Sequence, residues 1–278
     1  MLIQSLFNRL NVALNKHLLY SGPYSRRHLV VVEQHIYATL TSNKQLMDYV
    51  VSAARRRQSV LKLHGFSVSN YTNMVKQCLL EKGVEFEQLH ARPSQEDDFL
   101  AMSPMGKIPC LETAEGFLVE TSAILDYLEE VHPEPPMYPS QAFTRAKARE
   151  IIRVSELYIE LVARRHLGAA FFGRERSEKA YTEVRPQVEK GLRAFKQLAN
   201  FSPYVMGSEF GNADIVVYHV FRLASQILKR VYDWDIVTEI PGLATHIAAM
   251  DERDATKRVI ADHEEAMVAL MTQLKTAN

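Results

Sequence analysis

The chain has 278 residues, which is long enough for two domains of ordinary size. Hydrophobic residues make up 47% of the sequence, and 33 basic residues balance 33 acidic ones, so nothing in the net charge favours nucleic acid or an anionic surface. No stretch approaches the roughly 20 apolar residues that span a bilayer. The two cysteines, Cys78 and Cys110, form neither a disulfide framework nor a metal-binding spacing. We therefore expect a globular protein of a reducing compartment, the cytoplasm, with no metal, membrane or nucleic acid as partner.

Residues 1–59 differ in composition from the rest of the chain. No acidic residue precedes Glu33, whereas four basic residues do, and the apolar positions near the start are loosely helical. Three interpretations of this N-terminal extension remain open. It is dispensable, or an artefact of a start assigned too early when the true start is at Val60. Alternatively, it is a targeting or surface-binding segment, or it has a structural role.

A regular pattern begins at Val60. Residues 60–64 alternate like a half-buried strand, and the polar turn GFSVSNY over residues 65–71 leads into a helix that ends at Gly83. Residues 84–87 alternate as a second strand. A polar segment and a short helix ending near Met102 follow.

Residues 103–130, SPMGKIPCLETAEGFLVETSAILDYLEE, predict a hairpin followed by a helix. Pro109 suits the start of a strand, since it donates no ladder hydrogen bond and favours extended geometry before it. A turn at Glu115–Gly116 separates this strand from a second one over residues 117–119. Thr121 or Ser122 can cap the helix, whose N-terminal backbone N–H groups suit a carboxylate.

The predicted order is therefore βαβα followed by ββα, which gives a mixed sheet with helices on both faces. A proline-rich linker over residues 133–139 ends this unit. The remaining pattern is helical, with helices expected over residues 142–167, 177–199 (bent at Pro186) and from about 212. Two shorter helices are expected near residues 241–250 and 255–274.

Residues 60–278 resemble the cytosolic glutathione transferases, of the serine type and bacterial-like. The resemblance is carried by SPMGKIPCL, by LVETSAILDYLEE, by MYP at 137–139 and by FGNADI at 210–215. It implies a thioredoxin-like domain (βαβαββα) over residues 60–139 and an all-helical domain over residues 140–278 that lines the electrophile site. Gly211 stands where the family usually has Ser or Thr, so half of the reciprocal capping box around Asp214 is expected to survive.

The resemblance implies a glutathione site with Ser69 as its catalytic residue. Ser69 would donate a hydrogen bond to the glutathione thiolate and lower the thiol pKa. A simple helix cap is the alternative role for Ser69. Asn73, Tyr71 and Thr72 are the candidates for supporting the site.

The same resemblance implies the remaining glutathione contacts. Ile108, before a cis Pro109, would offer its backbone to the cysteinyl part of the tripeptide. Glu120 would contact the γ-glutamyl ammonium, and Thr121 would bind the γ-glutamyl carboxylate. Lys107 is a candidate partner for the glycine carboxylate, although a solvated lysine is the simpler interpretation.

As a whole, the resemblance implies a homodimeric enzyme that conjugates glutathione, its co-substrate, to a small electrophile. Glutathione-dependent isomerase, reductase or peroxidase chemistry is the alternative, as is a non-catalytic binding or regulatory protein. An anionic electrophile site built from Arg164, Arg165 and His166, with Arg153 nearby, competes with a solvated face or a dimer contact. The second pocket is expected to include Tyr158 and Leu161, and both cysteines are expected to be buried.

Overall fold

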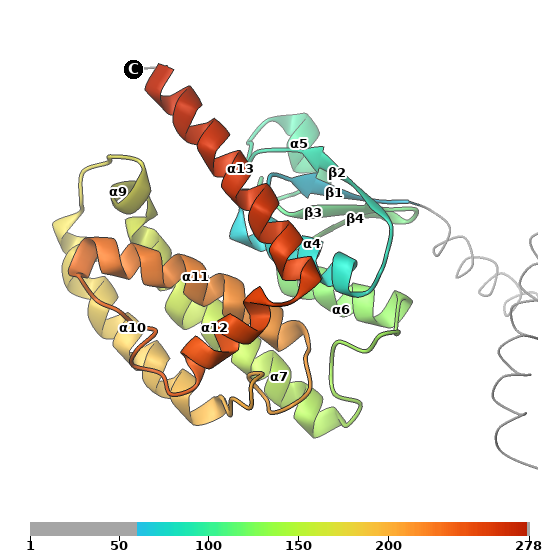
Figure 1. Cartoon of the computed structure of the whole chain (residues 1–278). Coiled ribbons are helices and arrows are strands. Elements are labelled where there is room, and N and C mark those ends of the chain that lie inside the picture. Colours follow the sequence, from blue (N-terminus) through green and yellow to red (C-terminus); the bar gives the residue numbers. More distant parts are fainter. Residues whose placement is uncertain (1–59, 277–278) are drawn as a thin grey trace, which may run out of the picture. The chain divides into compact units, whose positions relative to one another are not determined.

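The computed structural model describes residues 60–276, and the N-terminal extension predicted over residues 1–59 lies outside the described residues. A four-stranded sheet of order β2-β1-β3-β4 forms the first part (Figure 1). β1 and β2 pair in parallel, and β3 pairs antiparallel with β1 and β4. The elements in chain order are β1 (Leu61–Gly65), α4 (Asn70–Glu81), β2 (Phe86–His90), α5 (Asp97–Met102), β3 (Cys110–Thr113), β4 (Gly116–Val119) and α6 (Thr121–Val131). This order confirms the predicted βαβαββα unit.

Helices cover both faces of the sheet, as the sequence predicts. α4 and α6 pack against each other on one side, and α5 lies on the other (Figure 1). Leu61 and Leu63 of β1 are buried, whereas Lys62 and His64, which alternate with them, are half-buried, which is the expected period of two. Both cysteines are fully buried, as predicted.

The second part is helical throughout. Its helices are α7 (Ala142–Ser155), α8 (Leu161–Ala163), α9 (Leu167–Phe171), α10 (Glu178–Leu198), α11 (Asn212–Tyr232), α12 (Leu243–Asp251) and α13 (Asp254–Thr276), with a π-helical turn η1 (Glu156–Glu160) and a 3₁₀ turn η2 (Arg164–His166). The predicted helix 142–167 is thus a helical run interrupted by η1 and η2. The last helix, expected near residues 255–274, is confirmed as α13; with 23 residues it is not shorter than α11, and it packs along α4.

α11 is the central helix of this part. Its buried positions run from Asn212 to Leu228 and point in all directions around the helix, so it packs against helices on every side. Within residues 60–276, no helix combines the length and the apolar run that crossing a lipid bilayer requires.

The N-terminus of α11 has half of a capping box, as predicted. The Asp214 carboxylate accepts hydrogen bonds from Gly211 N (2.8 Å) and Val205 N (2.7 Å), while glycine has no side chain to return a bond. A Cβ atom at Gly211 would lie 2.6 Å from the Met137 carbonyl oxygen. Glycine is therefore required here by the close approach of the linker backbone.

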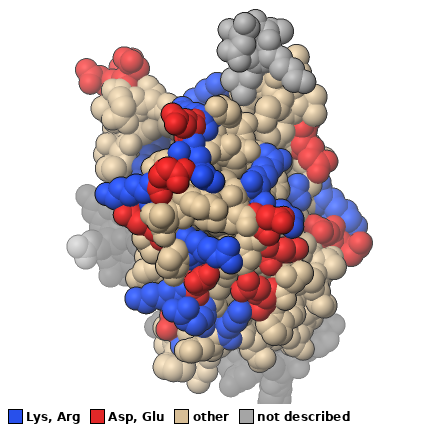
Figure 2. Space-filling view, turned by 90° about the vertical axis from the view of Figure 1, so that its left-hand side faces the viewer, with Lys and Arg blue, Asp and Glu red and all other residues tan. Residues whose placement is uncertain are grey.

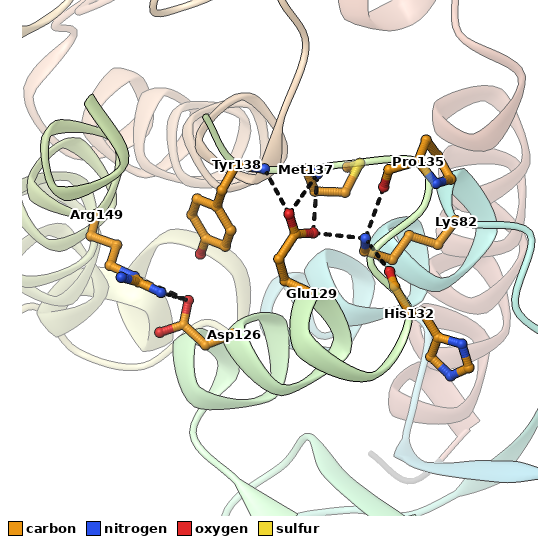
Figure 3. A network of polar contacts seen from close by, with 8 residues as sticks. All are labelled: Lys82, Asp126, Glu129, His132, Pro135, Met137, Tyr138 and Arg149. Carbon is orange, nitrogen blue, oxygen red and sulfur yellow. Dashed lines mark hydrogen bonds and ion pairs between the residues drawn. The ribbon is translucent and has the colours of Figure 1, made fainter. Parts of the chain in front are cut away.

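A buried lysine fastens the linker to the sheet-containing part (Figure 3). The Lys82 ammonium, at the C-terminal end of α4, donates to Glu129 (2.7 Å) and to the carbonyl oxygens of His132 and Pro135. Glu129 in turn accepts from the backbone N–H groups of Met137 and Tyr138. This network holds the linker residues 132–138 against α4 and α6.

Charges of both signs are interspersed on the surface. On the face drawn in Figure 2, lysine and arginine side chains lie among aspartate and glutamate side chains and form no extended patch of one sign. Ion pairs such as Arg165–Glu183 (2.6 Å) and Arg149–Asp126 (3.2 Å) show the same mixing at the level of single contacts. This distribution agrees with the zero net charge of the chain.

Candidate active site

The turn between β1 and α4 places Ser69 at the N-terminus of α4. Ser69 has extended backbone dihedrals, and its Oγ accepts a hydrogen bond from Thr72 N at 3.3 Å, so it is the N-cap of the helix. The carbonyl oxygen of Ser67 accepts from Asn73 Nδ2 (2.8 Å) and from His263 Nδ1 (3.0 Å). The turn is therefore held from α4 on one side and from α13 on the other.

A small pocket of about 140 Å³ lies at the N-terminus of α6. It is lined by Ile108, Pro109, Glu120 and Thr121 together with residues of η1 and its flanks. The Ile108–Pro109 peptide bond is cis, as the family resemblance implies. Glu120 has a φ of 67°, a left-handed value that is costly for a residue with a side chain and that clusters at functional sites.

The N-terminus of α6 suits a carboxylate, although the pocket lining also includes the acidic side chains of Glu120 and Glu156. The first backbone N–H groups of α6 have no acceptor within the helix, and Thr121 and Ser122 are buried at this terminus. The Ser122 hydroxyl donates to the buried Glu156 carboxylate at 2.9 Å, and Arg153 lies 3.4 Å from it. Burial raises the pKa of Glu156, although the Ser122 hydroxyl and the Arg153 charge oppose this shift.

A larger and mainly apolar pocket of about 380 Å³ opens beside the first. Ser69 and Asn70 line it at the start of α4. Half of the remaining lining residues come from the end of α9 and from α11 and α13: Phe171, Phe172, His219, Arg222, Leu223, Gln226, Ile260, His263, Met267 and Leu270. Four residues line both pockets: Tyr71, Lys107, Ile108 and Leu161. A ligand bound in the small pocket would therefore adjoin one bound in the larger.

Tyr71 lies between the two pockets, but its hydroxyl proton is already donated to a residue of the protein. Its hydroxyl donates to Glu160 Oε2 at 2.6 Å, and Glu160 also accepts from Asn70 Nδ2 and from Arg164. Burial raises the pKa of Tyr71, and the Glu160 carboxylate raises it further. A phenol held in this way offers a lone pair to a ligand, not a proton. Ser69 thus remains the better donor to a bound sulfur.

The predicted site residues are distributed over both pockets. Ser69 and Asn73 line the larger pocket, Pro109, Glu120 and Thr121 line the smaller, and Lys107, Ile108 and Tyr71 line both. Thr72 lines neither. Its side chain is fully buried, and a Cβ at Gly65 would lie 2.4 Å from its Oγ1, so Thr72 packs between α4 and β1.

The predicted anionic site on α7–α9 assembles only in part. Arg164 lines the larger pocket, but Arg165 pairs with Glu183 outside both pockets, and His166 is buried with its Nε2 2.8 Å from the Tyr232 hydroxyl. Arg153 lines the smaller pocket. Arg164, Arg165 and His166 diverge because they are successive residues of one helical turn, η2, and so point to different sides of it.

Tyr158 is also absent from the lining of either pocket. Its side chain is 55% exposed, whereas Leu161 lines both pockets as predicted. The extra residue of the π turn alters the face on which each side chain emerges.

Sequence reasoning missed four polar residues that shape the pockets. Glu156 and Glu160 are buried acids four residues apart, each beside an arginine at helical spacing. Two acids among the apolar positions of one helix are a signal that could have identified them. Arg222 and His263 reach the larger pocket from α11 and α13, and no local pattern marks them.

Comparison with known proteins agrees with this geometry. Residues 63–136 match the family model described as the N-terminal domain of glutathione S-transferase. A glutathione S-transferase of Pseudomonas putida is 39% identical over 217 residues, which cover 78% of this chain and 99% of the relative. A maleylacetoacetate isomerase of Pseudomonas aeruginosa is 24% identical over 200 residues. This match covers 66% of the present chain and 91% of the isomerase.

Solved structures show the same fold. The crystal structure of a glutathione S-transferase from Methylobacterium radiotolerans, in complex with glutathione sulfonate, superimposes with a TM-score of 0.61 at 23% identity. The match covers 72% of this chain and 94% of that one. Together with the 39% identity to the Pseudomonas putida protein, these findings show that the chain belongs to the glutathione S-transferase family.

Proposed function

We propose that the protein is a glutathione transferase that conjugates the glutathione thiolate to a small electrophile. The observation that carries this proposal is the junction of the two pockets. A small pocket suited to a carboxylate shares Tyr71, Lys107 and Ile108 with a larger apolar pocket, and Ser69 lies on the wall of the latter. A thiol held across the shared wall would meet an apolar electrophile directly.

Each predicted residue has a proposed role in this reaction. The Ile108 backbone, positioned by the cis Pro109, binds the cysteinyl unit of glutathione. Glu120 pairs with the γ-glutamyl ammonium, and Thr121 and the α6 N-terminus bind the γ-glutamyl carboxylate. Lys107, which lies between the pockets, pairs with the glycine carboxylate.

Ser69 stabilises the thiolate. Its Oγ accepts the cap hydrogen bond from Thr72 N, which leaves the hydroxyl proton available for the sulfur. Donation to the charged form lowers the thiol pKa, and the α4 N-terminus adds a favourable field. The thiolate then attacks the electrophilic carbon while the leaving group departs with its electron pair.

The domain arrangement belongs to the same proposal. Residues 60–139 form the glutathione-binding domain, residues 140–278 form the helical domain that lines the electrophile site, and residues 1–59 are an extension to this unit. We further propose a cytoplasmic homodimer that acts in detoxification, as expected of this family.

Glutathione-dependent isomerisation is a second candidate. The similarity to the Pseudomonas aeruginosa maleylacetoacetate isomerase favours it over reductase chemistry, since Ser69, not a cysteine, occupies the start of α4.

The test combines a binding measurement with turnover. Calorimetric titration with glutathione should give saturable binding, and a panel of benzyl halides, aryl halides, unsaturated ketones and hydroperoxides should identify the reaction. Conjugation supports the first proposal, and double-bond isomerisation without net consumption of glutathione supports the second. Binding without any turnover would favour a non-catalytic binding protein. Absence of glutathione binding would overturn all three.

A further inference from the structure

The larger pocket has an uneven charge. Its lining includes three cationic side chains, those of Lys107, Arg164 and Arg222, and no aspartate or glutamate among the described residues that form it. In a pocket with mainly apolar walls, an unbalanced positive charge attracts an anionic group more strongly than it would in water. The position of each cation decides which of them could bind that group.

Arg164 is already neutralised within the protein. Its guanidinium donates to the Glu160 carboxylate and to Asn70 Oδ1 (2.7 Å), and it lies over the Tyr71 ring. The Glu160 side chain is only 1% exposed and that of Arg164 is 31% exposed, so water screens this pair less than it screens a pair at the surface. Lys107 lies at the wall between the two pockets, where we have assigned it to glutathione.

Of the three cations, Arg222 is the one that is left to bind a ligand other than glutathione. It comes from the central helix α11 and lines only the larger of the two pockets. Its ion-pair partner in the described part of the chain is Glu264, at 3.5 Å, and 68% of the Glu264 side chain is exposed. The Arg222 guanidinium also contacts the Tyr218 hydroxyl, a neutral group that itself donates to Asp251. An exposed partner at this distance compensates the arginine poorly and can be displaced by a ligand carboxylate.

The two imidazoles near Arg222 stay neutral. Burial lowers the pKa of His219 to about 3, and the Arg222 charge acts in the same direction. Burial also lowers the pKa of His263, whose Nδ1 donates to the Ser67 carbonyl. Neither ring therefore competes with Arg222 for an anion at neutral pH. Apolar side chains such as Phe171, Leu223 and Met267 complete this part of the pocket.

We propose that the electrophile is an apolar, aromatic-sized molecule with a carboxylate remote from its reactive carbon, and that Arg222 binds this carboxylate. The inference rests on the proposed transferase function and names its substrate class. Arg222 would then determine specificity by favouring anionic electrophiles over neutral ones of the same shape. It would act mainly on electrophile affinity and would leave glutathione binding unchanged, because it does not line the smaller pocket.

The test uses a matched pair of electrophiles, 4-(bromomethyl)benzoate and its methyl ester. In both, the thiolate sulfur bonds to the benzylic carbon and bromide leaves with the electron pair, so only the remote charge differs. The ratio of their kcat/KM values, each corrected for the uncatalysed rate, is measured for the wild type, Arg222→Gln, Arg222→Lys and Arg165→Gln. Arg165→Gln is the matched control, because Arg165 pairs with Glu183 outside both pockets.

The acid should be preferred by the wild type, and Arg222→Gln should lower the acid-to-ester ratio about ten-fold. Arg222→Lys should restore part of the preference, and Arg165→Gln should leave the ratio unchanged. Calorimetric binding of glutathione and of the two stable S-benzyl conjugates accompanies the kinetics. This binding measurement does not depend on turnover. A thermal melt of each variant shows whether that variant is folded.

The outcomes separate the two proposals. If neither glutathione nor the conjugates bind, the proposed transferase function is wrong and the inference falls with it. If glutathione binds but the wild type treats acid and ester alike, or Arg222→Gln keeps the wild-type ratio in both kinetics and conjugate binding, the transferase function stands and the inference is overturned.

Discussion

One hydroxyl at Ser69 can fill two roles at the same time. Its oxygen accepts the cap hydrogen bond from Thr72 N, and its proton remains available to a ligand in the larger pocket. The alternative role of Ser69, a simple helix cap, is therefore compatible with catalysis. The two roles can be distinguished because a cap acts on stability and a thiolate donor acts on the thiol pKa.

Ser69→Ala should raise the pKa of the bound glutathione thiol and slow conjugation at neutral pH. Loss of the cap should also cost about 1 kcal/mol of stability. The check is thiolate ultraviolet absorbance against pH in the binary complexes, with Ser69→Thr as the control that keeps the hydroxyl. Superimposable titration curves for the wild type and Ser69→Ala would remove the catalytic role from Ser69.

Thr121→Ala should have the opposite kinetic signature. The Thr121 hydroxyl is assigned to a carboxylate far from the sulfur, so its contribution should be equal in the ground state and the transition state. Loss of a hydrogen bond to a charged group is worth roughly 1.5–3 kcal/mol. The KM for glutathione should rise while kcat is nearly kept, and Thr121→Ser should behave like the wild type. A large fall in kcat at saturating glutathione would contradict this assignment.

At the scale of the elements, the sequence predicts most of the fold because its apolar periods are regular. β1, α4, β3, β4 and α6 all begin within a few residues of the expected positions, with Gly83 and Pro109 as local markers. The π turn was not predictable, because residues 142–167 have a continuous helical pattern that marks no interruption. Because of that turn, Leu161 lines the pockets and Tyr158 is exposed to solvent.

The candidate site was predictable only where local sequence determines it. The cis Pro109 and the start of α6 belong to short motifs, whereas Arg222 and His263 reach the pocket from helices more than 140 residues downstream of Ser69. Their convergence depends on how α11 and α13 pack against α4. No local periodicity contains this information.

The Gly211→Ser variant tests whether the serine that the family usually has at this position would stabilise α11 in this protein. Serine would complete the reciprocal box, worth roughly a few tenths of a kcal/mol relative to glycine, but its Cβ would lie 2.6 Å from the Met137 carbonyl oxygen. The glycine has extended dihedrals (φ −164°), so the penalty is steric alone. Since overpacking costs about 1–3 kcal/mol, we expect a net loss of stability in urea unfolding.

Ser177→Gly is the reverse control for that experiment. Ser177 caps α10 through Ala180 N at 3.3 Å, and its loss gives the value of a serine cap in this chain. A Gly211→Ser variant that gains as much stability as Ser177→Gly loses would show that the linker backbone can move aside.

At the scale of the whole molecule, the Lys82 network joins the sheet-containing part to the linker that leads into the helical part (Figure 3). The Lys82 side chain is fully buried and its ammonium has three acceptors. Lys82→Met should cost about 3–5 kcal/mol, because it leaves the Glu129 carboxylate without its cation. Urea unfolding measures this, and Lys257→Met, which removes an exposed pair with Glu252, should change stability by less than about 1 kcal/mol.

A double variant, Lys82→Met with Glu129→Gln, identifies the origin of that loss. If the uncompensated carboxylate dominates, the double variant should be more stable than the sum of the single changes predicts. Strict additivity would instead indicate that Lys82 acts only through the carbonyl oxygens of His132 and Pro135.

The stability of the whole chain should also depend on the buried His219. Its pKa is lowered to about 3 in the folded state, mainly by burial, from an ordinary value of 6.5. Between these values the unfolded chain binds more protons, so the contribution of His219 is complete above pH 6.5 and is lost as the pH falls toward 3. The loss approaches about 1.4 kcal/mol per pH unit. Asp214, whose pKa burial raises to about 7, has the opposite effect between about pH 4 and 7 and masks part of this slope.

His219→Gln separates the two contributions. Glutamine keeps a donor for the Gln77 Oε1 acceptor, which lies 2.8 Å from His219 Nε2, but it does not titrate. The variant should therefore lose less unfolding free energy than the wild type between pH 6.5 and 4.5, while Asp214 contributes equally to both. Urea unfolding at pH 7.5, 6.0 and 4.5 measures the difference. Parallel pH profiles for the two proteins would show that His219 is protonated in the folded chain as readily as in the unfolded one.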